Sequence, residues 1–249
     1  MSPKNEIYLA PYRFSVLNQD SAFTKTFTMK AIELINTNIL PLRKTDKAET
    51  ALLWMNEYKL NHLPVVEHQK YLGLIAFADL SAFDHADKNV GKFCKNLFRP
   101  HILSDEHYYY ALKIMADFKI TVLPVISGND VYSGLITQDI LLSNLSESLS
   151  VQNPGGIIIL EINQHDFSLG EIVRIVESND TKILSTSIKT KPDSTFIEVT
   201  LKLNRINIDA VIQTFNRFHY EIKAYYGENE NDEDLLRDRY NSLMTYLNI

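Results

Sequence analysis

The sequence predicts a mixed fold of the α+β and α/β kind, in which a β-α-β-β-α unit occurs twice and a β-α-β-β-α-β unit follows. The first observation is an internal repeat: "NHLPVVEHQKYLGLIAFADL" from Asn61 is matched by "TVLPVISGNDVYSGLITQDIL" from Thr121, sixty positions later. The second is a Ser-, Pro- and Gly-rich stretch at 146–156, beyond which strand and helix patterns alternate in a new order. Together they predict a doubled module, a linker and a further unit.

Each copy of the repeat contains an amphipathic helix. Apolar side chains recur at i, i+3, i+4 and i+7, the spacing of one helix face; they are Ala48, Ala51, Leu52 and Met55 in the first copy, and Tyr108, Ala111, Leu112 and Met115 in the second. Asp46 and Glu49 have the spacing of a capping box, and Ser104 or Asp105 is expected to cap the second helix. A further leading helix is expected from Met29, in "MKAIELINTN".

A hairpin follows each of these helices. Strands at 63–66 and 123–126 lead through the polar turns "EHQK" and "SGND" into second strands that end in "GLIA" and "GLIT". Asp79 and Asp139 come next, where a carboxylate caps a further helix. A unit of about sixty residues buries too little surface by itself, so two copies packed sheet to sheet are predicted to share one core.

These features resemble CBS (cystathionine β-synthase) domains. In that family an Ala-apolar-x-x-Met helix precedes apolar-Pro-Val and then Gly-apolar-Ile-Thr-x-x-Asp, and the resemblance covers about 35–145. It implies a tandem CBS pair, or Bateman module, with the first repeat at 29–87 and the second at 88–148. It also implies two clefts that hold adenosine-containing regulatory ligands: AMP, ADP, ATP or S-adenosylmethionine.

The ligand-binding pattern of the family, Thr-x-x-Asp, is divided between the copies. In the family the acid accepts hydrogen bonds from the ribose and the threonine reaches the phosphate. The first copy reads Ala76-Phe77-Ala78-Asp79 and lacks the hydroxyl, whereas the second reads Thr137-Gln138-Asp139, with the acid one residue early. On a helical turn, a shift of one residue along the chain rotates the side chain by about 100°, so the early acid of the second copy points in another direction than the family's acid does.

The resemblance therefore implies a nucleotide cleft whose candidate residues are His62, Leu63, Pro64, Ala76, Asp79, Leu123, Pro124, Thr137 and Asp139. Structural roles compete with this interpretation. Asp79 and Asp139 can be helix caps only, the two prolines can be strand-entry residues, and His62 can be a surface histidine. The nearest basic residues are Arg43, Lys44 and Arg99.

Residues 149–155 read as a linker, and 156–227 predict a ferredoxin-like β-α-β-β-α-β unit. Strands are expected at 156–163, 181–190, 195–204 and 221–227. Helices are expected at 168–179 and 207–220, with Leu169, Ile172, Val173 and Val176 on one face of the first. This element order, rather than particular residues, resembles an ACT domain, and the CBS-CBS-ACT order is similar to acetoin-utilisation-type regulatory proteins. ACT domains bind amino acids at a paired interface; here Asp166 is available, but Gly170 falls within the helix.

Two terminal segments lie outside these units. Residues 1–28 match nothing in the repeat and are expected to be a disordered or loosely docked arm, or an upstream start that the native protein does not use. Residues 228–249 combine an acidic run with a helical stripe of Leu236, Tyr240, Leu243 and Leu247, which is expected to dock on the body or on a partner subunit.

Composition restricts the class of function. A net charge of −6 argues against a nucleic acid or a membrane surface as partner. A single Cys94, with no apolar run of about 18 residues, favours the cytoplasm. No metal-binding or nucleophile motif is present, so the sequence predicts a non-catalytic, homodimeric ligand sensor with no required cofactor and an unspecified protein partner. The alternative is a structural dimerisation module with degenerate sites.

Overall fold

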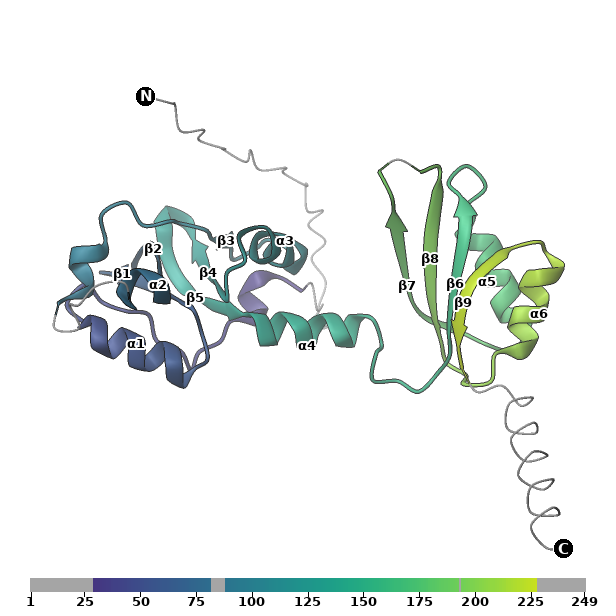
Figure 1. Ribbon diagram of the computed structural model, residues 1–249, viewed down its shortest axis with the longest axis horizontal. Helices are drawn as coiled ribbons and strands as arrows, with labels where there is room; N and C mark the ends of the chain where they lie inside the picture. The colour runs from purple at the N-terminus through teal and green to yellow at the C-terminus, as the bar shows by residue number, and fades with distance from the viewer. Residues whose placement is uncertain (1–28, 82–87, 193, 228–249) are drawn as a thin grey trace, which may run out of the picture.

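The computed structural model describes residues 29–81, 88–192 and 194–227, which form two α/β bodies in succession (Figure 1). The elements of the first body are η1 (Ala31–Leu34), α1 (Ala48–Glu57), β1 (His62–Glu67), β2 (Lys70–Ala76), α2 (Phe77–Ser81), η2 (Val90–Phe93), β3 (Ile102–Leu103), α3 (Tyr108–Phe118), β4 (Val122–Ser127), η3 (Gly128–Asp130), β5 (Val131–Thr137) and α4 (Gln138–Ser148). The α1–α2 half and the α3–α4 half repeat the same order, as the internal sequence repeat predicts.

The two hairpins of the first body have the same construction. β1–β2 and β4–β5 are antiparallel, and the register shifts at the same place in each, after Val65 and after Val125. They join at the Lys70–Val131 pair into a sheet of order β1-β2-β5-β4-β3. β3 runs parallel to β4, and in the first copy Leu42 forms the equivalent parallel bridge to Val65.

One hydrophobic core serves both repeats, which confirms the prediction of a shared interior. The expected packing of sheet on sheet is wrong, because the two hairpins join edge to edge in one sheet. The buried cluster combines the inner faces of α1 and α3 with both hairpins; its helical members include Ala48, Ala51 and Met55, and Tyr108, Ala111 and Met115. These are the residues that the 3.6-residue spacing assigns to the core. Neither repeat holds a complete core alone.

The segments that precede α1 and α3, residues 29–47 and 88–107, are called the lead-in segments. Each one packs against the hairpin of the other repeat, and this exchange explains the two strand glycines. Asn36, ahead of α1, bridges Leu135 of the second hairpin, whereas Phe98, ahead of α3, bridges Leu74 of the first. Gly73 and Gly134 lie at these crossings with φ of +152° and +153°. A Cβ built on Gly73 would lie 2.4 Å from Leu97 Cβ, and one on Gly134 would lie 2.2 Å from Ile35 Cγ2. Each glycine therefore permits a close approach between the halves.

Two local expectations for the start of the first repeat are wrong. The expected leading helix from Met29 is only the four-residue 3-10 turn η1. Asp46 does not cap α1, whose N-cap Lys47 makes no side-chain cap hydrogen bond; its carboxylate accepts from the Arg43 N–H at 2.7 Å.

The second copy departs from the expected cap in the same way. The N-cap of α3 is His107, whose Nδ1 accepts from the Tyr109 N–H, and neither Ser104 nor Asp105 caps the helix. Glu106 instead accepts from the Leu103 N–H at 2.9 Å. In both copies the acid closes the turn before the helix, because the backbone N–H three residues earlier is its nearest donor.

The second body comprises β6 (Ile157–Asn163), α5 (Leu169–Glu177), β7 (Ile183–Thr190), β8 (Phe196–Leu203), α6 (Asp209–Arg217) and β9 (Glu221–Tyr226). Its antiparallel sheet has the order β7-β8-β6-β9, and both helices cover one face (Figure 1). Element order and bounds agree with the sequence prediction for this region. Leu169 does not belong to the buried face of α5, which is formed by Ile172, Ile175 and Val176.

In the part of the chain that the structure describes, no helix combines the length and apolar character needed to cross a bilayer. The expected N-terminal arm at 1–28 and the predicted apolar stripe of Leu236, Tyr240, Leu243 and Leu247 both lie outside the described residues.

Candidate functional site

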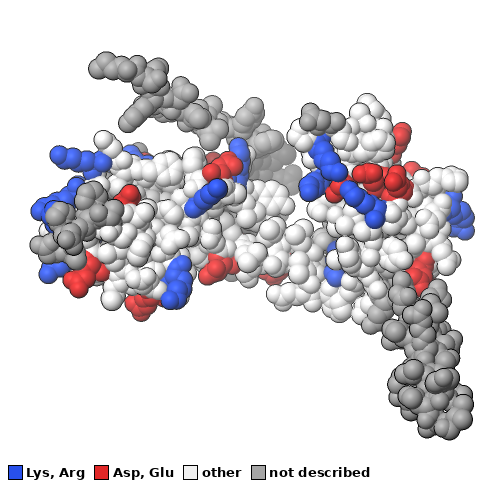
Figure 2. Space-filling model, in the orientation of Figure 1, with Lys and Arg blue, Asp and Glu red and all other residues white. Residues whose placement is uncertain are grey.

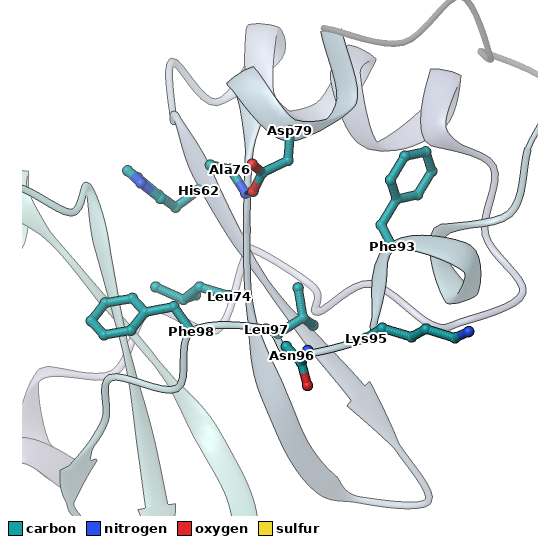
Figure 3. Close-up of a pocket in the computed structure, with 9 residues that line it drawn as sticks. All are labelled: His62, Leu74, Ala76, Asp79, Phe93, Lys95, Asn96, Leu97 and Phe98. Atoms are coloured by element: carbon teal, nitrogen blue, oxygen red, sulfur yellow. Dashed lines mark hydrogen bonds between the residues drawn. The ribbon is translucent and has the colours of Figure 1, made fainter. Parts of the chain in front are cut away.

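A cavity of about 420 Å³ opens at the carboxyl end of β2, between the first repeat and the lead-in segment of the second. Its lining, drawn in Figure 3, comprises His62, Leu74, Ala76, Asp79, Phe93, Lys95, Asn96, Leu97 and Phe98. Three of the predicted site residues, His62, Ala76 and Asp79, are thus brought together. The volume lies in the range of small-molecule sites.

Asp79 lies in the first turn of α2, which begins as soon as β2 ends at Ala76. Its Oδ2 accepts a hydrogen bond from the Ala76 N–H at 3.1 Å, and Figure 3 shows the carboxylate beside Ala76. Asp79 is therefore the third helical residue, which ties back to the N-cap backbone, rather than the N-cap itself. The side chain is exposed, so its other oxygen remains able to accept from a ligand hydroxyl.

His62 begins β1 and pairs with Ala76 across the hairpin. Its Nδ1 lies 3.3 Å from the Thr121 backbone nitrogen and 3.2 Å from Thr121 Oγ1, so this ring joins the first repeat to the second. Thr121 Oγ1 also accepts from the Asn61 N–H at 3.0 Å. Burial lowers the pKa of His62, and the nearby Asp79 carboxylate opposes that shift.

The outer wall of the cavity is a short excursion of the second lead-in segment. In the first lead-in, Leu34 is followed directly by Ile35, the residue that packs on Gly134. In the second, residues 94–96 separate Phe93 from Leu97, the residue that packs on Gly73. The excursion places Lys95 and Asn96 on the wall, with Asn96 at a positive φ of 65°.

The chemistry of the lining suits a small ligand that carries hydroxyl and anionic groups. Asp79 offers hydrogen-bond acceptance, Lys95 offers a positive charge, and His62 can supply a second one on protonation. Phe93, Leu74 and Phe98 add apolar surface; Phe98 is 50% exposed and meets Phe118 edge-on, with ring centroids 4.9 Å apart.

The remaining predicted residues do not meet around this cavity. Leu63 and Pro64 in β1, and Leu123 and Pro124 in β4, are buried strand residues. In the second copy, Thr137 is 5% exposed at the start of α4 and makes no side-chain cap hydrogen bond, whereas Asp139, the second residue of α4, is exposed.

The basic residues nearest to the motif in sequence are engaged elsewhere. Lys44 Nζ lies 2.5 Å from Glu67 Oε2, and Arg99 donates to the Tyr71 carbonyl at 2.9 Å while facing Asp130. Lys95 supplies the charge instead. Sequence analysis missed it because it lies outside the repeated text, although the extra length before Leu97 is visible when the two lead-ins are compared.

Among the described residues, no group of three or more His, Cys, Asp or Glu side chains is placed to hold a metal ion. In the second body, Asp166 is exposed in the turn after β6, with its N–H bound to the Asn163 carbonyl at 2.9 Å, and Gly170 lies within α5.

Comparison with known proteins identifies the first repeat. The family model of the CBS domain matches residues 31–85. An uncharacterized protein of Methanocaldococcus jannaschii is 32% identical over 102 residues, which are 39% of this chain and 33% of that protein. The matched stretch thus spans about a third of the length of this curated relative.

Solved structures of CBS-domain proteins are also similar. A CBS domain pair/ACT domain protein from Thermotoga maritima is 20% identical, with a TM-score of 0.44, over 49% of this chain and 99% of that one. A putative acetoin utilization protein from Vibrio cholerae is 21% identical, with a TM-score of 0.44, over 50% and 96%. CBSX2, solved in complex with AMP, is 17% identical, with a TM-score of 0.42, over 47% and 96%. The match of the family model to residues 31–85 confirms the predicted resemblance to CBS-domain proteins.

Proposed function

We propose that this chain, whose residues 31–85 match the CBS domain, is a non-catalytic regulatory protein that binds an adenosine nucleotide in the cavity beside Asp79. The observation that carries the proposal is that Asp79, His62 and Lys95 all line one cavity at the end of β2. Together they offer an acceptor for ribose hydroxyls and cationic groups for phosphate.

The proposed ligand contacts follow from the position of each group. The free carboxylate oxygen of Asp79 accepts from the ribose, while Lys95, and His62 once its ring turns from Thr121, supply positive charge for the phosphate. Ala76 lacks the hydroxyl that the family pattern provides, so the strand end contributes only backbone groups there. The aromatic and aliphatic lining contacts the base. AMP, ADP and ATP are the ligands proposed, with S-adenosylmethionine as a further member of the class.

The two repeats are proposed to bind unequally. In the second copy Asp139 is displaced along α4 and Thr137 is turned into the protein, so the pair of groups that a nucleotide needs is not assembled there. We therefore assign the nucleotide site to the first repeat and its cavity, and treat Thr137, Asp139, Leu123 and Pro124 as structural residues.

Regulation would follow from the exchanged lead-in segments. A ligand that touches both β2 and residues 93–98 contacts both repeats, so its affinity differs between two arrangements of the halves. The coupling passes along α4 to the second body, which we propose is an ACT-type domain in a homodimeric cytoplasmic protein. The proposed units are 29–87, 88–148 and 156–227, with 149–155 as linker.

Thermal unfolding with a nucleotide panel tests the proposal. A ligand that binds only the folded state stabilises it by about 2.7 kcal/mol at a hundredfold excess over Kd, so the melting temperature should rise with concentration for at least one of AMP, ADP, ATP and S-adenosylmethionine. Adenosine and GMP serve as controls for the phosphate and the base. No shift with any adenosine compound at millimolar concentration would leave the structural dimerisation module as the better account.

A further inference from the structure

The His62 side chain makes two kinds of contact: it lines the proposed nucleotide cavity, and it bonds to the second repeat. The Thr121 N–H donates to Nδ1 at 3.3 Å. Thr121 Oγ1 lies 3.2 Å from the same nitrogen, and because Oγ1 already accepts from the Asn61 N–H, its own proton is available to Nδ1. Nδ1 is therefore the acceptor nitrogen of a neutral ring, and the ring proton belongs on Nε2.

Protonation of this ring conflicts with the contact that it makes. A cationic imidazole carries a proton on both nitrogens, so Nδ1 can no longer accept from the Thr121 N–H. The Thr121 hydroxyl can turn to accept instead, but the backbone N–H loses its acceptor. The contact between the repeats must then rearrange or open to water.

The surroundings of the ring set the direction of its response. Asp79 on α2 and Lys95 in the lead-in segment are the charged groups that share the cavity with it. From β2 it meets Ala76, and from the second repeat it meets the Thr121 amide and hydroxyl. Burial keeps the pKa of His62 low in the empty cavity, and a bound anion raises it.

We propose that an anionic ligand in this cavity binds with uptake of one proton by His62, and that the protonated ring gives up Thr121 as it turns to the anion. The inference rests on the proposed function, since it names how that site is regulated. The proton comes from solvent and no covalent bond changes. Ligand binding in the first repeat thereby changes the contact with the second repeat at Thr121. Because a proton is taken up, the ligand binds more tightly as the pH falls.

Calorimetric titration of the full chain with AMP, in two buffers of different ionisation enthalpy, measures the protons taken up. We expect up to one proton per AMP in the wild-type protein, with Kd weakening by at most about tenfold per pH unit between about pH 5.5 and pH 7.5. In His62→Gln the uptake and the slope should fall, although AMP still binds. The phosphate's own titration is common to both proteins, so the difference between them isolates His62.

The matched control is His101→Gln, which alters an exposed histidine whose ring nitrogen faces the Arg99 carbonyl outside the cavity lining. This variant should behave as the wild type does. Equal proton uptake in wild type and His62→Gln, with AMP bound to both, would overturn the inference while leaving the proposed function standing.

A second experiment, on the free protein, needs no ligand. Thr121→Val removes the hydroxyl that bonds to Nδ1, so the proton resonance of the His62 ring should titrate at a different pH from that in the wild type. An unchanged titration would show that Thr121 does not hold the ring. If no nucleotide binds at any pH, the proposed function fails together with the ligand half of this inference, and the Thr121 arm still decides whether the ring links the two repeats.

Discussion

Asp79 has two roles that a pair of substitutions can separate. Its carboxylate closes the first turn of α2 through the Ala76 N–H, and we propose that it also holds the ligand ribose. Asp79→Asn keeps a side-chain oxygen for the backbone but loses the charge, whereas Asp79→Ala loses both. A hydrogen bond to a charged group contributes about 1.5–3 kcal/mol, so AMP should bind Asp79→Asn about 10- to 100-fold more weakly.

Calorimetric titration with AMP and urea unfolding of the free proteins check this separation. Asp79→Asn should unfold close to the wild type, and Asp79→Ala should lose about 1 kcal/mol with the helix contact. Asp139→Asn is the control, because Asp139 is exposed on α4 and should leave AMP binding unchanged. Undiminished binding by Asp79→Asn would remove the ribose role and leave only the helix role.

At the level of single residues, sequence reasoning found the acid but not its environment. Asp79 and His62 were identified from their place beside the repeated text, and the structure brings both to the cavity. Lys95 and Phe93 were missed, because neither lies in a repeated motif and a loop excursion has no period. The helix-capping expectations failed where a closer backbone donor was available, as at Asp46 and Arg43.

At the scale of elements, the strand glycines hold the exchanged lead-ins against the hairpins. Gly73→Ala would place a Cβ 2.4 Å from Leu97 Cβ and 2.9 Å from the Phe98 carbonyl oxygen, at a φ that disfavours alanine. We expect it to lower the free energy of unfolding by about 1–3 kcal/mol, because the lead-in must move and the backbone is strained.

Gly128→Ala is the matched control for Gly73→Ala. A Cβ at Gly128 meets nothing within 4 Å, so urea unfolding should differ from the wild type by no more than about 0.5 kcal/mol. Both substitutions restrict the unfolded chain alike, which leaves the native contact as the difference. Equal unfolding of the two variants would mean that the lead-in crossing at Gly73 adapts without cost.

A second element-scale prediction concerns the uncovered face of the second sheet, where acidic and basic side chains lie next to one another (Figure 2). Glu198 on β8 bonds to Lys223 on β9 and lies 3.0 Å from Lys191. The bond from Lys223 and then that from Lys191 lower the pKa of Glu198 to about 2.

A carboxyl whose folded pKa is depressed stabilises the protein above its unfolded pKa, and that contribution is lost as the pH falls towards the folded value. The melting temperature should therefore fall less between about pH 4.5 and pH 2 in Glu198→Gln than in the wild type. Glu177→Gln, which breaks the exposed Lys182 pair at 2.7 Å, is the control and should keep the wild-type profile. Identical acid profiles for Glu198→Gln and the wild type would contradict the prediction.

Most elements were predictable because their patterns are strong and local. The alternation in 156–163 and 195–204 and the helical stripes of α1 and α3 survive folding, since one face of each element is buried. The segment at 31–34 was overestimated as a helix. It is only one 3-10 turn, because the chain must leave it at once to bridge the second hairpin at Leu135.

At the scale of the whole molecule, the repeat predicted a shared core but not which clefts remain open. The two copies are alike in their hairpins and in the lead-in residue that packs on each strand glycine, yet the second lead-in has the extra residues 94–96, two of which line the cavity beside Asp79. That asymmetry depends on where the chain crosses between the repeats. Only the tertiary arrangement reveals it, since local propensity carries no information about a crossing.

The central claim is one nucleotide site per chain, formed by the first repeat. Native mass spectrometry of the full chain, titrated with AMP, ADP and ATP, tests it most directly. The account predicts that each chain gains the mass of one nucleotide at saturation, that Asp79→Asn needs about 10- to 100-fold more nucleotide for the same occupancy, and that Asp139→Asn behaves as the wild type does. Two nucleotides per chain, or none with any of the three, would contradict it.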